Sequence, residues 1–248
     1  MITTNEGIVN ADFQGGTLLL INKPQDWTSF DVVNKVRWAI RNKLNVKKIK
    51  VGHSGTLDPM ATGLLLICTG RWTKKLHELQ GLPKQYTGTV TLGGETASYD
   101  KESEVTKTYS LEGITSQSIK SAVNDFIGDI KQLPPMFSAI KINGRPLYKL
   151  ARKGEVIERK LRSVSVERFE MTSWDVPDFN FIVDCGKGTY VRSLAHDLGQ
   201  KLGCGGYLSA LRRTRVGEYI IEDAWELDSL IEAIYQSKII SEKHNTVV

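Results

Sequence analysis

The residues best suited to chemistry are concentrated in one short loop, which runs from Val51 to Gly63. Three glycines and Pro59 specify its backbone tightly, because glycine reaches angles that other residues avoid and proline fixes its own. Asp58 directly precedes Pro59, which favours an extended backbone there. The loop leads into the apolar run 64–68, which indicates a buried strand or a short buried helix. A carboxylate held at the edge of a core in this way is a candidate nucleophile or acid–base group.

Two other interpretations of this loop remain open. An aspartate before a proline often caps backbone amides in a turn and does no chemistry. The run Gly52-His53-Ser54-Gly55 also resembles the elbow of a serine hydrolase. Its second glycine falls one place too early for Gly-x-Ser-x-Gly, so an esterase is the weaker alternative.

An ionised carboxylate in a partly dry site needs a cationic partner, because otherwise it takes up a proton. Arg192 is the candidate, since it opens a predicted helix after a glycine-rich turn and its guanidinium stays charged. An ordinary surface role for Arg192 is equally compatible with the sequence. The rings of Tyr86, Tyr190 and His53 together fit a pocket for an unstacked nucleobase.

Composition places the chain among globular proteins of a reducing compartment. Its 248 residues are 40% hydrophobic and 25% charged, and no apolar run approaches the length that spans a membrane. The three cysteines are an odd number without Cys-x-x-Cys spacing, which argues against a disulfide framework and against a zinc site. The start of the chain lacks the pattern of a signal peptide. We therefore expect a cytoplasmic protein without a metal.

Positive charge is gathered in two blocks, within a net charge of +5. The first basic block, residues 32–50, has seven basic residues and no acidic one. The second basic block, residues 139–162, has eight basic residues against Glu155 and Glu158. Either block alone is compatible with a solvated helix face. The two together favour a polyanionic partner, most simply nucleic acid.

The elements that must position these residues form an α+β pattern. Strands are predicted at 17–21, 86–92, 164–171, 179–185 and 216–221. Helices are predicted from a capping box at Thr28 and Asp31 to about Leu44, and at 116–128, 146–153, 189–202 and 227–239. Because strands and helices rarely alternate, the pattern favours a mixed, mainly antiparallel sheet flanked by helices over a doubly wound fold.

At these residues a family resemblance emerges. The run 53–63 closely resembles the signature loop of the TruB-type tRNA pseudouridine synthases, which isomerise the uridine at position 55 in the T-loop of tRNA. Further matches to that family's motifs follow in the same order from about Gly16 to Trp225. They are Asn22-Lys23-Pro24, Trp27-Thr28-Ser29, Lys84-Gln85-Tyr86, 134–139, Asn143-Gly144-Arg145, Leu147-Tyr148, 187–192 and 211–214.

The resemblance implies catalytic roles for Asp58, Arg192 and Tyr86, and a place for Asp100 among the residues that bind the substrate. Asp58 corresponds to the catalytic aspartate, which either adds to the ring or promotes a glycal-like route while uracil leaves C1′ through N1 and rejoins through C5. Arg192 would be its salt-bridge partner, and Asp100 a second acid near that arginine. The segment before Asp100 reads Thr96-Ala97-Ser98-Tyr99, where bacterial members often read Thr-Asp-Thr-x. This difference concerns a loop contact, and Asp100 itself is retained.

The resemblance also implies how the base is held. Tyr86 would stack on it and could move a proton, and His53 would occupy the place that the flipped nucleotide leaves. Tyr190 and Leu211 would line the uracil pocket.

For the whole chain, the resemblance implies a pseudouridine-synthase fold that uses no cofactor. A catalytic domain is expected at 16–225, between a flexible tail at 1–15 and a C-terminal helix and tail at 226–248. The residues after Trp225 are too few for the PUA-type domain of many relatives, so RNA docking is expected to rest on the basic blocks. We expect a monomer that binds the T-stem-loop of tRNA without an obligatory protein partner or a membrane.

Two further functions are compatible with parts of this pattern. A guide-RNA-dependent pseudouridine synthase subunit shares a closely similar aspartate loop, and activity on bare tRNA would separate it from a stand-alone enzyme. A non-catalytic RNA-binding protein would explain the basic blocks and the rings, but it leaves the Asp58 loop unexplained.

Overall fold

The computed structural model describes residues 7–8, 11–142 and 144–237, which divide into two compact units. The first unit comprises residues 1–82 and 213–248, and the second comprises residues 83–212. The strand β12 (Gly206–Val216) contributes residues to both units.

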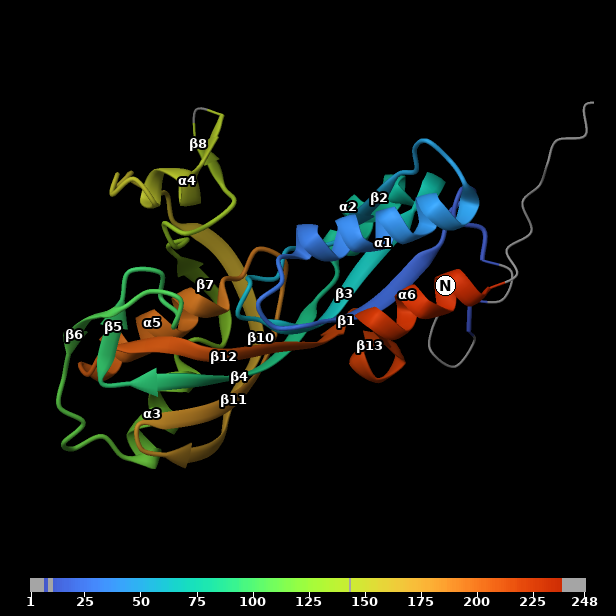
Figure 1. Cartoon of the computed structure of the whole chain (residues 1–248). Coiled ribbons are helices and arrows are strands. Elements are labelled where there is room, and N and C mark those ends of the chain that lie inside the picture. Colours follow the sequence, from blue (N-terminus) through green and yellow to red (C-terminus); the bar gives the residue numbers. More distant parts are fainter. Residues whose placement is uncertain (1–6, 9–10, 143, 238–248) are drawn as a thin grey trace, which may run out of the picture. The chain divides into compact units, whose positions relative to one another are not determined.

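The sheet of the first unit is built around β3 (Thr62–Thr69), which carries the apolar run of the signature loop (Figure 1). It pairs antiparallel with β1 (Leu18–Lys23) and with the short strand β2 (Val51–His53). On its other edge, β1 pairs in parallel with β14 (Trp225–Glu226). This pairing confirms the strand predicted at 17–21, and of the two alternatives predicted for 64–68 it shows the buried strand.

Both faces of this sheet are covered, which explains why β1 and β3 are apolar without alternation. One face packs on α1 (Ser29–Leu44) and α6 (Leu227–Gln236), which contact each other. The other face packs on the 3₁₀-helix η1 (Gly70–Lys75), α2 (Leu76–Gly81) and the segment after β12. Side chains that point in opposite directions along each strand fill the two cores separately.

The described part of the N-terminal segment belongs to the first of these cores. Ile8, Ala11 and Phe13 are buried there, and Phe13 is only 1% exposed. The expectation that 1–15 is a flexible tail is therefore wrong for these three residues, because their apolar side chains pack with α1 and the sheet. The predicted helix 227–239 is present as α6 up to Gln236, and residues 238–248 lie outside the described residues.

The start of α1 is fixed by the capping box that the sequence predicted. Thr28 accepts a hydrogen bond from the Asp31 amide at 3.1 Å, and the Asp31 carboxylate accepts one from the Thr28 amide at 3.0 Å. The Thr28 hydroxyl also donates to the Asp31 carboxylate at 2.6 Å. This hydrogen bond, followed by the one from the Thr28 amide, lowers the pKa of Asp31. The helix ends at Asn45 in the left-handed conformation, as predicted near Leu44.

The second unit contains a sheet with the strand order β7-β10-β11-β4-β12. The strands that precede β12 in the chain are β4 (Lys84–Leu92), β7 (Gly128–Gln132), β10 (Arg162–Asp175) and β11 (Asp178–Cys185). Adjacent strands of this group pair antiparallel. The helix α3 (Ser116–Asn124) packs on β10 and on α5 (Val191–Leu202). Phe169 lies edge-on to Phe181 at 5.5 Å between ring centroids, inside this core.

The second unit also contains two short β-hairpins. One pairs β5 (Gly94–Thr96) with β6 (Val105–Thr108). The other pairs β8 (Lys141–Ile142) with β9 (Arg145–Pro146) and leads into α4 (Leu147–Ala151). The second hairpin and α4 carry much of the second basic block.

The element predictions are confirmed except near the end of the chain. The strand expected at 216–221 is the short β13 (Tyr219–Ile220), which forms a hairpin with β12. The long strand β12 itself was missed, because Arg212, Arg213 and Arg215 hide its alternation. With six α-helices and mostly antiparallel strands in the described residues, the chain is α+β as predicted. Among those residues, no helix has both the length and the apolar composition to cross a membrane.

The close approach of α5 to the start of β12 gives a first prediction. A Cβ at Gly199 would lie 2.1 Å from the Gly206 nitrogen, a backbone atom that cannot swing aside. Gly199→Ala should therefore destabilise the protein, although alanine favours helix over glycine by about 1 kcal/mol. Gly81→Ala is the matched control, because a Cβ there, at the end of α2, meets nothing within 4 Å. Thermal unfolding of both variants tests this, and equal melting temperatures would contradict it.

Candidate functional site

The loop that carries Asp58 is held against the start of α1. The Leu57 amide donates to the Ser29 hydroxyl at 2.8 Å, and the Asp26 amide donates to the Pro59 carbonyl at 2.9 Å. Within the loop, the Ala61 amide donates to the Asp58 carbonyl at 3.1 Å. Asp58 itself is partly exposed, whereas Leu57 and Met60 are buried on either side of it. The half-buried Asp58 therefore stands on a firmly anchored backbone.

Two fully buried cations fasten this loop through its carbonyl oxygens. Lys23, with no exposed surface, donates to the Pro24, Trp27 and Pro59 carbonyls at 2.9, 2.5 and 3.2 Å. An irregular loop leaves carbonyls without strand partners, and a buried ammonium needs acceptors, so each satisfies the other.

Arg213, which is 1% exposed, plays the corresponding role on the other side of the loop. Its Nε donates to the Leu64 carbonyl at 2.7 Å and its Nη2 to the Gly55 carbonyl at 3.3 Å. Gly63 adopts a φ of +104°, and a Cβ there would lie 2.3 Å from the Arg213 carbonyl oxygen. The loop can therefore enter β3 at this point only with glycine.

His53 lies at the end of β2, on the same loop as Asp58. Burial is the main cause that lowers the pKa of His53, and the nearby Arg213 guanidinium lowers it further. A lowered pKa keeps the imidazole neutral at neutral pH. A neutral, half-buried ring suits the predicted role of filling a vacated base position.

In the second unit, Arg192 is the centre of a buried polar cluster. It lies in the first turn of α5, is 5% exposed, and forms an ion pair with Asp100 at 3.4 Å. Its guanidinium also donates to the Ser98 carbonyl at 3.1 Å and to the Phe137 carbonyl at 2.8 Å. The predicted proximity of Asp100 and Arg192 is confirmed by this ion pair.

The other predicted residues of this unit lie on elements around α5. Tyr190 is the N-cap residue of α5, and its amide and carbonyl are both hydrogen-bonded to the Gln132 side chain, at 2.8 and 3.1 Å. Tyr86, on β4, pairs in register with Val183 of β11 and is 9% exposed. Leu211, on β12, is also 9% exposed.

The seven predicted site residues thus fall into two groups. The first unit holds His53 and Asp58, and the second holds the other five, which are Tyr86, Asp100, Tyr190, Arg192 and Leu211. The predicted salt bridge between Asp58 and Arg192 joins the two groups and stays a prediction. In the sequence, Lys23, Ser29 and Arg213 stand out only as parts of matching motifs, without a role of their own. Their burial, which the structure supplies, identifies them as the anchors of the loop.

Both basic blocks present their charges at the surface of their own unit. In the first block, Arg41, Lys47, Lys48 and Lys50 are exposed on or just after α1. In the second block, Lys149 and Arg152 are exposed, whereas Leu147 and Leu150 anchor α4 in the core. These surfaces are suited to phosphate contacts, which need mobile, solvated cations.

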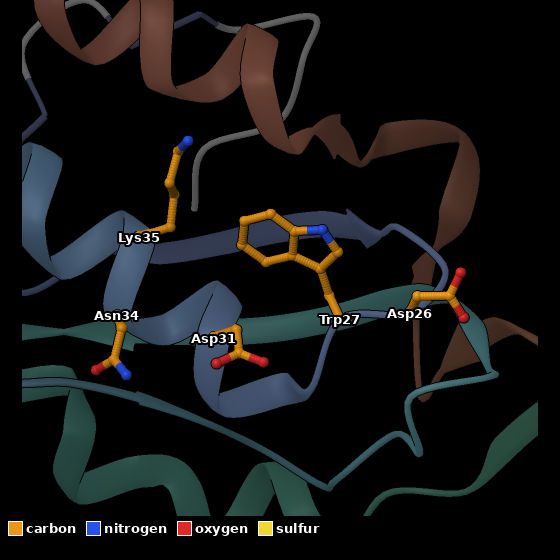
Figure 2. Close-up of a pocket in the computed structure, with 5 residues that line it drawn as sticks. All are labelled: Asp26, Trp27, Asp31, Asn34 and Lys35. Carbon is orange, nitrogen blue, oxygen red and sulfur yellow. The ribbon is translucent and has the colours of Figure 1, made fainter. Parts of the chain in front are cut away.

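A pocket of about 400 Å³ lies at the start of α1 (Figure 2). It is lined by Asp26, Trp27, Asp31, Asn34 and Lys35. The Lys35 ammonium lies 5.9 Å from the centre of the Trp27 ring. Two of the five lining side chains are carboxylates, so this pocket is a poor receptor for a polyanion. In the described residues, no cluster of histidine, cysteine or carboxylate side chains is arranged to hold a metal ion.

Comparison with known sequences gives a consistent family assignment. The family model described as "TruB family pseudouridylate synthase (N terminal domain)" matches residues 41–191. The model described as "tRNA pseudouridylate synthase B C-terminal domain" matches residues 192–245. The protein named tRNA pseudouridine synthase B of Phocaeicola vulgatus is 46% identical over 92% of this chain and 97% of its own length. The protein of the same name from Flavobacterium johnsoniae is 47% identical over 90% of this chain and 98% of its own length.

Solved structures agree with the sequence comparison. A chain of the archaeal box H/ACA sRNP Nop10–Cbf5 complex is similar with a TM-score of 0.64 and 26% identity, over 90% of this chain and 55% of its own length. A chain of a Cbf5–Nop10–Gar1 complex has a TM-score of 0.65 and 28% identity, over 94% of this chain and 62% of its own length. The predicted pseudouridine-synthase fold is confirmed by these likenesses.

The anchoring of the loop by Arg213 gives a second prediction. Lysine in its place keeps the charge but loses the planar fork whose Nε and Nη2 donate to the two carbonyls, so Arg213→Lys should lower the free energy of unfolding by about 1–3 kcal/mol. Arg215→Lys is the matched control, because Arg215 is exposed on the same strand. Chemical denaturation of both variants measures the difference. A loss in Arg213→Lys no larger than in Arg215→Lys would show that the two hydrogen bonds are unimportant.

Proposed function

The chain belongs to the TruB family of pseudouridylate synthases, and we propose that it isomerises a uridine of tRNA to pseudouridine, with uridine 55 of the T-loop as the target. The observation that carries this proposal is the anchored loop, which presents Asp58 on a rigid backbone. Support for tRNA as substrate comes from the names of relatives that match over nearly their whole length.

The reaction exchanges one glycosidic bond for another. The N1–C1′ bond of uridine breaks, the uracil turns, and a C5–C1′ bond forms. The C5 proton is lost and N1 gains a proton, so no atom or electron is added from outside. Asp58 supplies the carboxylate that reacts with the nucleoside, either by adding to the ring or by promoting a glycal-like route.

The remaining site residues hold the base and the carboxylate in this proposal. Arg192 forms a salt bridge with Asp58 and keeps the carboxylate ionised and oriented. Tyr86 stacks on the flipped base, and Tyr190 and Leu211 line its pocket. His53 takes the place of the flipped nucleotide, which lowers the cost of unstacking the base.

The exposed cations of the two basic blocks bind the phosphates of the T-stem-loop. Such contacts position the RNA without reading its sequence. The protein acts in the cytoplasm as a monomer, without an obligatory protein partner. A guide-RNA-dependent role is the alternative, favoured by the similarity to Cbf5 chains. Formation of pseudouridine in unmodified tRNA by the purified chain, mapped to single nucleotides, distinguishes the two.

A third prediction tests the catalytic aspartate. Asp58→Asn should abolish pseudouridine formation while leaving the fold and most of the RNA affinity intact, because an amide keeps the shape and loses the nucleophile. The measurement is release of tritium from C5 of uridine in labelled tRNA, together with circular dichroism and a binding titration. Asp26→Asn, an exposed carboxylate beside the same loop, is the control and should stay active. Turnover by a verified Asp58→Asn preparation would refute the assignment.

A fourth prediction tests the second basic block. Lys149→Glu and Arg152→Glu should each weaken binding of all tRNAs alike, without changing which uridine reacts. Removal of one phosphate-binding cation should reduce the slope of log Kd against log salt concentration by about 1. Lys120→Glu, an exposed lysine of α3 outside both blocks, is the control. A salt slope that matches the control would show that α4 does not contact RNA.

A further inference from the structure

We propose that Ser98 is a positioning residue for Arg192, and that its hydroxyl acts through the carboxylate of Asp100. The inference rests on the catalytic role proposed above for Arg192. Ser98 donates from its Oγ to Asp100 Oδ1 at 2.5 Å, and Asp100 Oδ2 lies 3.4 Å from Arg192 Nη1. The hydroxyl and the guanidinium thus hold opposite oxygens of one carboxylate.

These contacts matter for the charge of Asp100 because both Ser98 and Asp100 are buried. Ser98 is 4% exposed and Asp100 is not exposed at all. A buried carboxylate stays ionised only with donors directed at its oxygens. Besides the Ser98 hydroxyl, Asp100 Oδ1 accepts a hydrogen bond from the Glu102 amide at 3.0 Å. Loss of the hydroxyl would therefore remove one of the donors to Oδ1 and weaken the restraint that keeps the carboxylate beside Arg192.

Ser98 contacts both members of the ion pair. Its carbonyl oxygen accepts the hydrogen bond from Arg192 Nη1 at 3.1 Å, while its side chain holds Asp100. A change in the position of Ser98 is therefore transmitted to the guanidinium by two routes. Replacement of the side chain removes only the route through Asp100.

The loop around Ser98 is built to hold this geometry. Tyr99 has a positive φ of 65°, an uncommon conformation for a side chain other than glycine, and its ring stacks on His196 of α5 with 3.8 Å between centroids. Because Tyr99 turns outward onto α5, the side chains before and after it meet each other. The Ser103 hydroxyl accepts a hydrogen bond from the Ser98 amide at 2.9 Å and contacts the Ser98 hydroxyl.

Thr96 provides an internal contrast in the same loop. Its hydroxyl is equally buried, but it donates to the main-chain oxygen of Asp100 at 2.7 Å and not to the carboxylate. The Ser98 hydroxyl also lies 3.3 Å from that main-chain oxygen, so both Thr96→Val and Ser98→Ala remove support from the loop. Ser98→Ala additionally removes the hydroxyl that orients the carboxylate. A purely structural role would affect both variants alike.

The test compares steady-state kinetics on unmodified tRNA, with C5 tritium release as the readout. Ser98→Ala should lower kcat by about 10- to 100-fold, the loss that corresponds to one hydrogen bond to a charged group, with KM changed less than about twofold. Thr96→Val should keep the kcat of the wild type. In an Asp100→Asn background, Ser98→Ala should lower kcat by less than about threefold further, because the two residues act as one unit.

Three results would overturn the inference while the wild type remains active. They are an unchanged kcat in Ser98→Ala, an equal loss in Thr96→Val, and strictly additive effects of Ser98→Ala and Asp100→Asn. If Ser98→Ala does not fold, Ser98→Cys replaces it, because a thiol is a weaker donor at the same position, and wild-type kcat in that variant overturns the inference. An inactive wild-type chain would refute the proposed function itself, and this inference with it.

Discussion

Buried cations that donate to main-chain carbonyls are the interaction on which the site loops depend. Lys23 and Arg213 hold the loop of Asp58, and Arg192 holds the backbone at Ser98 and Phe137. Irregular loops expose carbonyl oxygens that no strand satisfies, and a buried cation without acceptors would be costly. Each buried cation therefore satisfies carbonyl oxygens of its loop, and the loop supplies the acceptors that the cation needs.

The same kind of contact links Arg192 to the second basic block. The segment from Gln132 to Phe137 leads into that block, and the start of α5 binds it at successive points. Tyr190 pairs with the Gln132 side chain, the Ser193 hydroxyl donates to the Leu133 carbonyl at 2.9 Å, and Arg192 donates to the Phe137 carbonyl at 2.8 Å. A shift of the segment 132–137 would therefore be transmitted directly to Arg192.

Local sequence signals predicted the parts that depend on neighbouring residues. The capping box of α1 and the rigid loop before β3 are set by contacts within a few positions, so pattern reasoning found them. The family resemblance supplied the pair of Asp100 and Arg192, which lie far apart in the chain. No local rule could have provided that pair.

Burial of charge was the main feature that the sequence concealed. Arg213 is among the largest fully buried side chains, yet the run of arginines around it resembles a solvated segment, and β12 was missed for that reason. Phe13 was assigned to a tail because the few residues around it show no periodicity. In both places tertiary packing decides the outcome, since the partners come from distant strands and helices.

The mode in which Arg192 is held bears on its chemistry. Neutral carbonyls restrain a guanidinium without cancelling its charge. A carboxylate in tight contact would restrain the guanidinium and also neutralise it. The contact with Asp100, at 3.4 Å, is longer than the 2.7–2.9 Å typical of a tight charge-assisted hydrogen bond. Asp100 therefore orients the arginine and neutralises it only partly. A cation held in this way keeps attraction for another carboxylate, which is the property that a partner of Asp58 requires.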